Sequence, residues 1–72
     1  MQVFIVSQGE RSEGSRVKGV FDSIEKARMF AGVIRARLTE DVTWRPVSWK
    51  EEAPDYWCEG CDYVDIDTQE VR

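Results

Sequence analysis

One amphipathic helix dominates the sequence and limits how the rest of the chain can fold. Asp22 and Glu25, three residues apart, predict a capping box with Asp22 as the N-cap, and the helix should end near Leu38–Thr39. A single helix must bury its apolar side against another layer, which has to come from the other segments of this 72-residue chain. The apolar stripe consists of Ile24, Ala27, Phe30, Ala31, Ile34 and Leu38, all at helical spacing.

The segments outside the helix have the composition of β-strands. Residues 3–6 and 16–21 are rich in β-branched and aromatic residues, and a glycine-containing loop over residues 8–15 separates them. Residues 42–49 predict a third strand, which Pro46 places at a sheet edge or a bulge. Residues 50–62 are predicted to form a polar loop, and residues 63–68 alternate as a final strand.

In that last strand Val64 and Ile66 should face the core, whereas Tyr63, Asp65 and Asp67 should face water. The order β-β-α-β-β then predicts an α+β fold with two layers. An antiparallel sheet of three to four strands would carry one helix on one face, and residues 1–72 would form a single domain.

Charge is distributed unevenly along the chain. The formal net charge is −4, yet residues 1–50 carry a net +3 and residues 51–72 a net −7. Phosphate contacts need cations, so the acidic segment argues against direct nucleic-acid binding by that surface. It favours a protein partner with a basic surface, although acidic loops can also serve only to keep a small protein in solution.

No apolar run approaches the about 20 residues that a membrane-spanning helix needs. The N-terminal residues 1–6 have neither a positive region nor a small-residue cleavage site, so they do not resemble a secretory signal. The sequence therefore predicts a protein of the cytoplasm without membrane contact.

The segment Cys58-Glu59-Gly60-Cys61 has three interpretations. Two cysteines at this spacing form half of a zinc site, but the chain has no histidine and no third cysteine, so carboxylates or a second copy in a homodimer would have to complete it. A redox couple is disfavoured because the neighbouring acids raise a thiol pKa. The favoured interpretation is a turn in which Gly60 supplies a positive φ, with no cofactor.

Five aromatic residues fall within about twenty positions of one another and next to the acids. A core this small can bury only some of them, and Trp44 is the first candidate for burial. Aromatic side chains rimmed by carboxylates are typical of binding hot spots, although they could instead cover the open end of the sheet. The predicted partner-binding residues are Asp55, Tyr56, Trp57, Glu59, Asp62, Asp65 and Asp67.

Catalysis is not predicted. The chain has no histidine to serve as a base, and no serine lies in a nucleophile-elbow context. Gly9 and Gly14 lack the Lys-Ser/Thr of a phosphate-binding loop. Asp62, Asp65 and Asp67 could suggest a divalent metal, but alternating acids on a wet sheet face are usually just solvated.

Residues 3–10 and 17–27 resemble a group of short uncharacterised proteins encoded by phages, in which a strand ending Gly19-Val20-Phe21 leads into a helix near Glu25-Lys26-Ala27. The resemblance covers about residues 3–31 and implies a phage or mobile-element origin, with action in the host cytoplasm. Small phage proteins commonly bind and disable a host factor or a host defence.

The sequence thus predicts a non-catalytic binding protein, an inhibitor of the anti-CRISPR type that uses its acidic, aromatic C-terminal segment. The alternative is a zinc- or thiol-dependent small module that acts through Cys58 and Cys61, for which a symmetric dimer is one option. The sequence leaves monomer and homodimer open.

Overall fold

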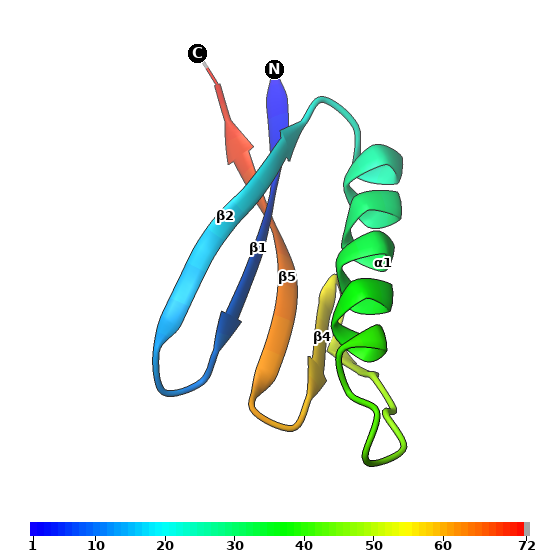
Figure 1. Cartoon of the computed structure of the whole chain (residues 1–72). Helices are drawn as coiled ribbons and strands as arrows, with labels where there is room; N and C mark the ends of the chain where they lie inside the picture. Colours follow the sequence, from blue (N-terminus) through cyan, green and yellow to red (C-terminus); the bar gives the residue numbers. More distant parts are fainter. Residues whose placement is uncertain (72) are drawn as a thin grey trace.

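The computed structural model of the protein describes residues 1–71. One antiparallel five-stranded sheet has the strand order β2-β1-β5-β4-β3, and one helix packs against a single face of it (Figure 1). The predicted α+β class with one helix on a sheet is confirmed, with one or two strands more than expected. The elements are β1 (Gln2–Glu10), β2 (Gly14–Phe21), α1 (Ile24–Glu40), β3 (Lys50–Ala53), β4 (Tyr56–Glu59) and β5 (Asp62–Glu70).

The first and last strands form the centre of the sheet. β1 pairs with β5 over its whole length, so the two chain ends lie side by side, and the Val71 N–H donates to the Met1 carbonyl at 2.7 Å (Figure 1). β1 also forms a hairpin with β2, while β5 forms a second hairpin with β4. The acidic C-terminal segment is therefore built into the sheet, with β5 at its centre and β3 at its edge, and is not an appended tail.

The prediction of a strand over residues 42–49 is wrong, and so is that of a loop over residues 50–62. The chain after α1 is irregular up to Trp49, and β3 and β4 then form a hairpin. Pro54 and Asp55 supply its two-residue turn, in which Asp55 has a positive φ of 60°. β3 escaped prediction because it is a fully exposed edge strand of polar sequence.

The helix begins one residue later than predicted. Ser23 is the N-cap, and its hydroxyl accepts the Lys26 backbone N–H at 3.2 Å. Asp22 instead accepts a hydrogen bond from the Lys26 ammonium group at 2.9 Å, which lowers the pKa of Asp22. The capping box predicted from Asp22 and Glu25 is therefore wrong, although the helix itself is confirmed.

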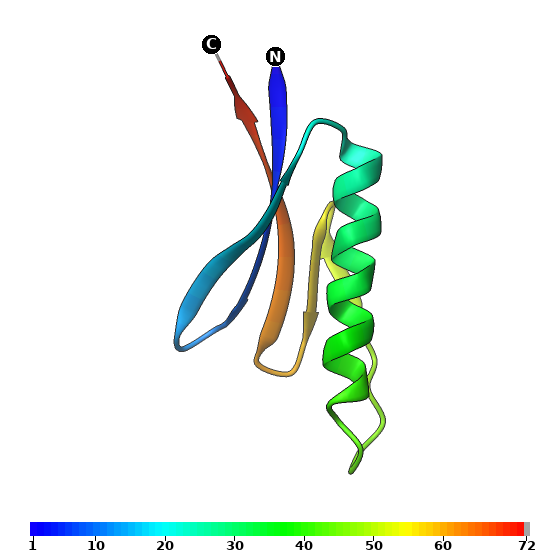
Figure 2. The ribbon, with the colours of Figure 1, turned by 45° about the horizontal axis from the view of Figure 1, so that its top comes forward.

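The core lies between α1 and one face of the sheet (Figure 2). Ala27 and Ala31 are fully buried, and their small side chains let the helix approach the strands closely. Phe30 packs against Phe21, with 5.2 Å between the ring centroids, and Gly19 leaves the space that these rings occupy. The buried apolar cluster consists of Val6, Ala27, Ala31, Ile34, Trp57 and Val64.

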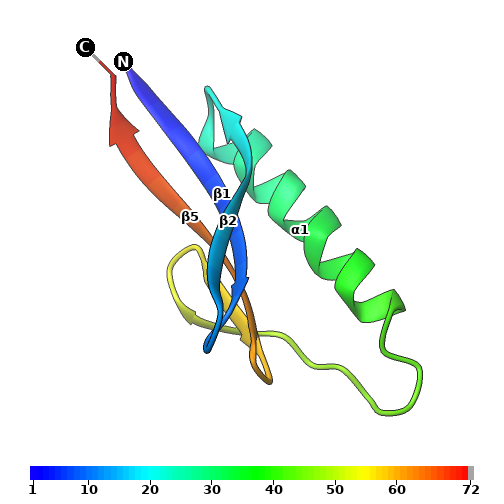
Figure 3. The ribbon, with the colours of Figure 1, turned by 60° about the vertical axis from the view of Figure 1, so that its left-hand side comes forward.

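The other face of the sheet has no covering layer. In the views of Figures 2 and 3 the only helix of residues 1–71 lies on one side of the sheet, and no strand crosses the opposite side. The uncovered side is called the open face below.

Candidate functional site

The register of the strands defines which residues share the open face. Cross-strand partners point to the same side of a sheet, so Ile5 lies with Val20 and Asp67, and Ser7 lies with Val17 and Asp65. Asp65 also pairs with Tyr56 on β4, so Tyr56 lies on the same side of the sheet. The open face includes Val3, Ile5, Ser7, Val17, Val20, Tyr56, Tyr63, Asp65 and Asp67, and it continues through Cys58, the partner of Tyr63, to Lys50 on β3.

Two tyrosines form the aromatic part of the open face. The rings of Tyr56 and Tyr63 stack with 5.8 Å between centroids and 14° between planes. Asp65 is the direct cross-strand partner of Tyr56, so a carboxylate lies beside the stacked pair. Partial burial, and then the charge of Asp67, raise the pKa of Asp65. A cation placed next to these two carboxylates would relieve their repulsion and stabilise their charged forms.

The other half of the open face is apolar. Val17 is 62% exposed and Val20 is 58% exposed, both on the edge strand β2. Ile5 and Ser7 connect these valines to Asp67 and Asp65 in adjacent rows of the sheet. The open face therefore combines an apolar patch with a tyrosine–carboxylate patch, which is the composition of many protein-binding surfaces.

Trp57 does not belong to this surface, which corrects the prediction of an exposed aromatic anchor. Its side chain is 7% exposed on the helix side of β4, where the Arg35 guanidinium lies 4.3 Å from the ring centroid. The indole N–H donates to a Glu51 carboxylate oxygen at 2.9 Å. Trp44, which the sequence placed in the core, is 75% exposed in the connection between α1 and β3.

Glu59, Asp62 and Asp55 also leave the predicted surface. Glu59 follows Trp57 by two residues and shares the helix side, where Arg45 donates to both of its oxygens at 2.6 and 2.9 Å. The Glu59 side chain is only 10% exposed, and hydrogen bonding to Arg45 lowers its pKa. Glu59, predicted as a partner-binding residue, is therefore largely covered, and the charge of Arg45 neutralises its carboxylate.

Asp62 lies on the same side of the sheet as Val64. The hydrogen bond to Glu59 is the main cause that raises the pKa of Arg45, and the charge of Asp62 adds to it. Asp55 occupies the β3–β4 turn, where the Arg28 guanidinium donates to its two oxygens at 2.8 and 3.4 Å. Of the seven predicted partner-binding residues, the structure brings together three on the open face: Tyr56, Asp65 and Asp67.

The Cys58–Cys61 segment forms the two-residue β4–β5 turn. Glu59 pairs with Asp62, and Gly60 has a φ of 59°, so the predicted glycine conformation is confirmed. Cys58 is buried and Cys61 is exposed, and both are free thiols. Hydrogen bonding to Glu52, and then burial, raise the pKa of the Cys58 thiol, which disfavours the reactive thiolate.

Within residues 1–71 no group of three or more His, Cys, Asp or Glu side chains is arranged to hold a metal ion. Zinc at Cys58 and Cys61 would need ligands from a second copy of the chain, so zinc binding stays a prediction. The open face offers carboxylates, phenol groups and apolar side chains. These groups suit non-covalent binding of a cationic surface.

Sequence reasoning named Tyr56, Asp65 and Asp67 as binding residues, but it did not include Tyr63, Val17 or Val20 among them. The alternating apolar residues of 16–21 could have indicated Val17 and Val20. However, an exposed apolar side of a strand has the same sequence pattern as a buried one until the position of the helix is known.

No helix of the described chain is long and apolar enough to cross a membrane. Comparisons of the chain with protein-family models, with curated proteins and with solved structures find no match.

Proposed function

We propose that this protein is a non-catalytic binding protein that attaches through its open face to a basic surface of a larger protein. The observation that carries the proposal is the stacked Tyr56–Tyr63 pair beside Asp65 and Asp67 on an uncovered sheet face. Tyrosines provide large contact area at a low entropic cost, and the carboxylates select cationic partners.

The position of the charges supports a basic partner. Asp67 is exposed, and its recorded contact is a hydrogen bond from the Gln69 amide at 2.6 Å. No ion pair within residues 1–71 includes Asp65 or Asp67, whereas Asp55 and Glu59 are each paired with an arginine. Lysine or arginine side chains of a partner would supply the missing counter-charges, and cations can also stack on the tyrosine rings.

The specific form that we propose is inhibition of a host factor or defence system, of the anti-CRISPR type, by a phage-encoded protein in the host cytoplasm. Its support is the resemblance of residues 3–31 to short phage proteins. Those residues span β1, β2 and the first half of α1, so the resemblance includes Val17 and Val20 of the open face. Covering the nucleic-acid-binding surface of a host protein would be one way for an acidic face to inhibit it.

The test compares two variants with the same net charge. Asp65→Asn with Asp67→Asn removes two acids from the open face, and Glu25→Gln with Glu40→Gln removes two from the exposed side of α1. A partner is first isolated from host extract with the tagged protein, and binding is then measured by surface plasmon resonance at several salt concentrations. The open-face variant should bind at least about tenfold more weakly and lose much of the salt dependence, while the helix variant should keep both.

Equal effects of the two variants would contradict the proposal, because they would show that only net charge matters. The proposal would also be contradicted if the two variants bound the partner with the same affinity as the wild-type protein. Tyr63→Ala gives an independent measure, since loss of the stacked ring should mainly increase the dissociation rate.

A further inference from the structure

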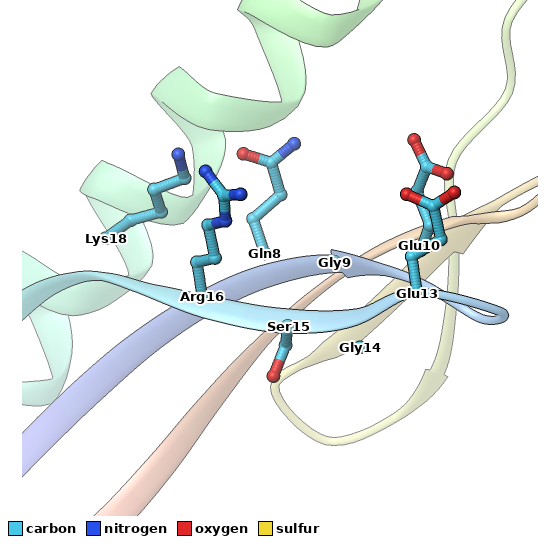
Figure 4. Close-up of a pocket in the computed structure, with 8 residues that line it drawn as sticks. All are labelled: Gln8, Gly9, Glu10, Glu13, Gly14, Ser15, Arg16 and Lys18. Carbon is cyan, nitrogen blue, oxygen red and sulfur yellow. The ribbon is translucent and has the colours of Figure 1, made fainter.

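A groove with unpaired cations runs along the helix side of the β1–β2 hairpin. Two hollows of about 330 and 240 Å³ adjoin at Gln8 and Lys18, which line both of them. Figure 4 shows Gln8, Arg16 and Lys18 pointing to the same side of the hairpin, while Ser15 points to the other side. We call the two hollows together the cationic groove.

The part of α1 from Phe30 to Leu38 forms the opposite wall. Phe30, Ile34 and Leu38 provide apolar surface at this wall, and Arg37 adds a third cation. The groove thus combines an apolar wall with a few convergent polar groups, as small-molecule sites do. Phe30 and Leu38 are partly buried members of the core layer, which keeps the apolar wall in place.

Arg16, Lys18 and Arg37 differ from most other cationic residues of the described chain because no ion pair includes them. Arg11, Lys26, Arg28 and Arg45 form ion pairs, and Arg35 lies over the Trp57 ring. In a protein of net charge −4, three unneutralised cations at the cationic groove form a local site for an anion.

The arrangement also orients a ligand. Glu10 and Glu13 line the far end of the groove, near the tip of the hairpin, and would repel an anion there (Figure 4). The anionic group therefore belongs near Lys18, which borders both hollows between Arg16 and Arg37. An apolar body attached to it would lie over Phe30, Ile34 and Leu38.

We propose that the cationic groove binds a small amphipathic anion, in which a carboxylate, sulfonate or phosphate is attached to an apolar body. The groove lies on the opposite side of the sheet from the open face, so this site is independent of the proposed function. Charge-assisted hydrogen bonds from the cations would hold the anionic group, and burial against α1 would hold the rest.

The probe is anilinonaphthalenesulfonate, whose affinity is measured by fluorescence titration. N-phenylnaphthylamine has a similar apolar body without the sulfonate and serves as the uncharged control. Lys18→Gln is matched by Lys50→Gln, which makes the same charge change on the edge strand β3, away from the groove. Lys18→Gln should weaken sulfonate binding by about fivefold and leave the uncharged compound unaffected, while Lys50→Gln should change neither by more than about twofold.

Amide chemical shifts of the wild-type protein locate the probe independently. Shifts should change at Gln8, Lys18 and Arg37, and not at Tyr63 on the open face. The proposal is overturned if Lys18→Gln and Lys50→Gln weaken binding equally, if the uncharged compound binds as tightly as the sulfonate, or if no binding is measurable. Shifts confined to Tyr63 and its neighbours would overturn it too.

Discussion

Replacing Trp57 by alanine should remove most of the stability of this protein. The ring is 7% exposed and packs in the core with Ile34 and Val64. Burying about 200 Å² of an aromatic side chain at about 25 cal/mol per Å² contributes about 5 kcal/mol, and measured Trp→Ala losses in protein cores are about 3–5 kcal/mol. Loss of the Arg35 contact over the ring adds about 0.5–1 kcal/mol.

The loss expected for Trp57→Ala is large compared with the total free energy of unfolding of the protein. A domain of 72 residues has a free energy of unfolding of about 4–10 kcal/mol. Trp57→Ala should therefore be largely unfolded or close to it in urea titrations followed by far-ultraviolet circular dichroism. Trp57→Phe keeps most of the ring volume and loses the N–H bond to Glu51, so it should cost about 1–2 kcal/mol and remain folded.

Trp44→Ala is the matched control, because it makes the same substitution at a residue that is 75% exposed. It should change the free energy of unfolding by less than about 0.5 kcal/mol. The reasoning is refuted if Trp44→Ala destabilises the protein as much as Trp57→Ala, or if Trp57→Ala unfolds at the same urea concentration as the wild type.

Three further outcomes are expected. Gly9→Ala should cost about 2 kcal/mol or more in urea unfolding, because its Cβ would lie 2.3 Å from the Gly14 carbonyl oxygen; unchanged stability would contradict this. Cys58→Ser with Cys61→Ser should keep the fold, and a chelator should not alter the melting temperature; zinc bound stoichiometrically to purified protein would favour the metal-dependent alternative. Asp65→Asn should be more stable than wild type at neutral pH. A raised native-state pKa means that the wild type loses stability as pH rises, so the difference should vanish below pH 3.8 in thermal melts, and a constant difference would exclude this cause.

The two proposed sites differ in the sign of their charge, and they lie on opposite sides of the sheet. The open face combines carboxylates with stacked tyrosines, whereas the cationic groove has Arg16, Lys18 and Arg37 beside the helix. The sequence shows a basic first part and an acidic last part, but β1 and β5 are neighbours in the sheet. Segregation of charge in space therefore comes from the alternation of side chains along strands, and not from the separation of the two segments along the chain.

Local patterns were sufficient for several features of the fold. The 3.6-residue period over residues 24–38 predicted α1, and the alternation of Val64 and Ile66 with Tyr63 and Asp65 predicted the two sides of β5. Gly60 predicted the β4–β5 turn, since a positive φ there favours glycine. Each of these features depends on residues that are close together in the sequence, so the sequence alone was enough to predict it.

Other features depend on contacts between distant segments, and only the tertiary structure decided them. Glu51 and Trp57 became part of a hairpin because a two-residue turn brings β3 onto β4. The seven residues predicted as one site were divided because neighbours in a strand point to opposite sides of a sheet. Alternation shows which side chains share a side, but the position of the single helix determines which side is buried. Trp57 lies under that helix, and Tyr56 is left on the open face.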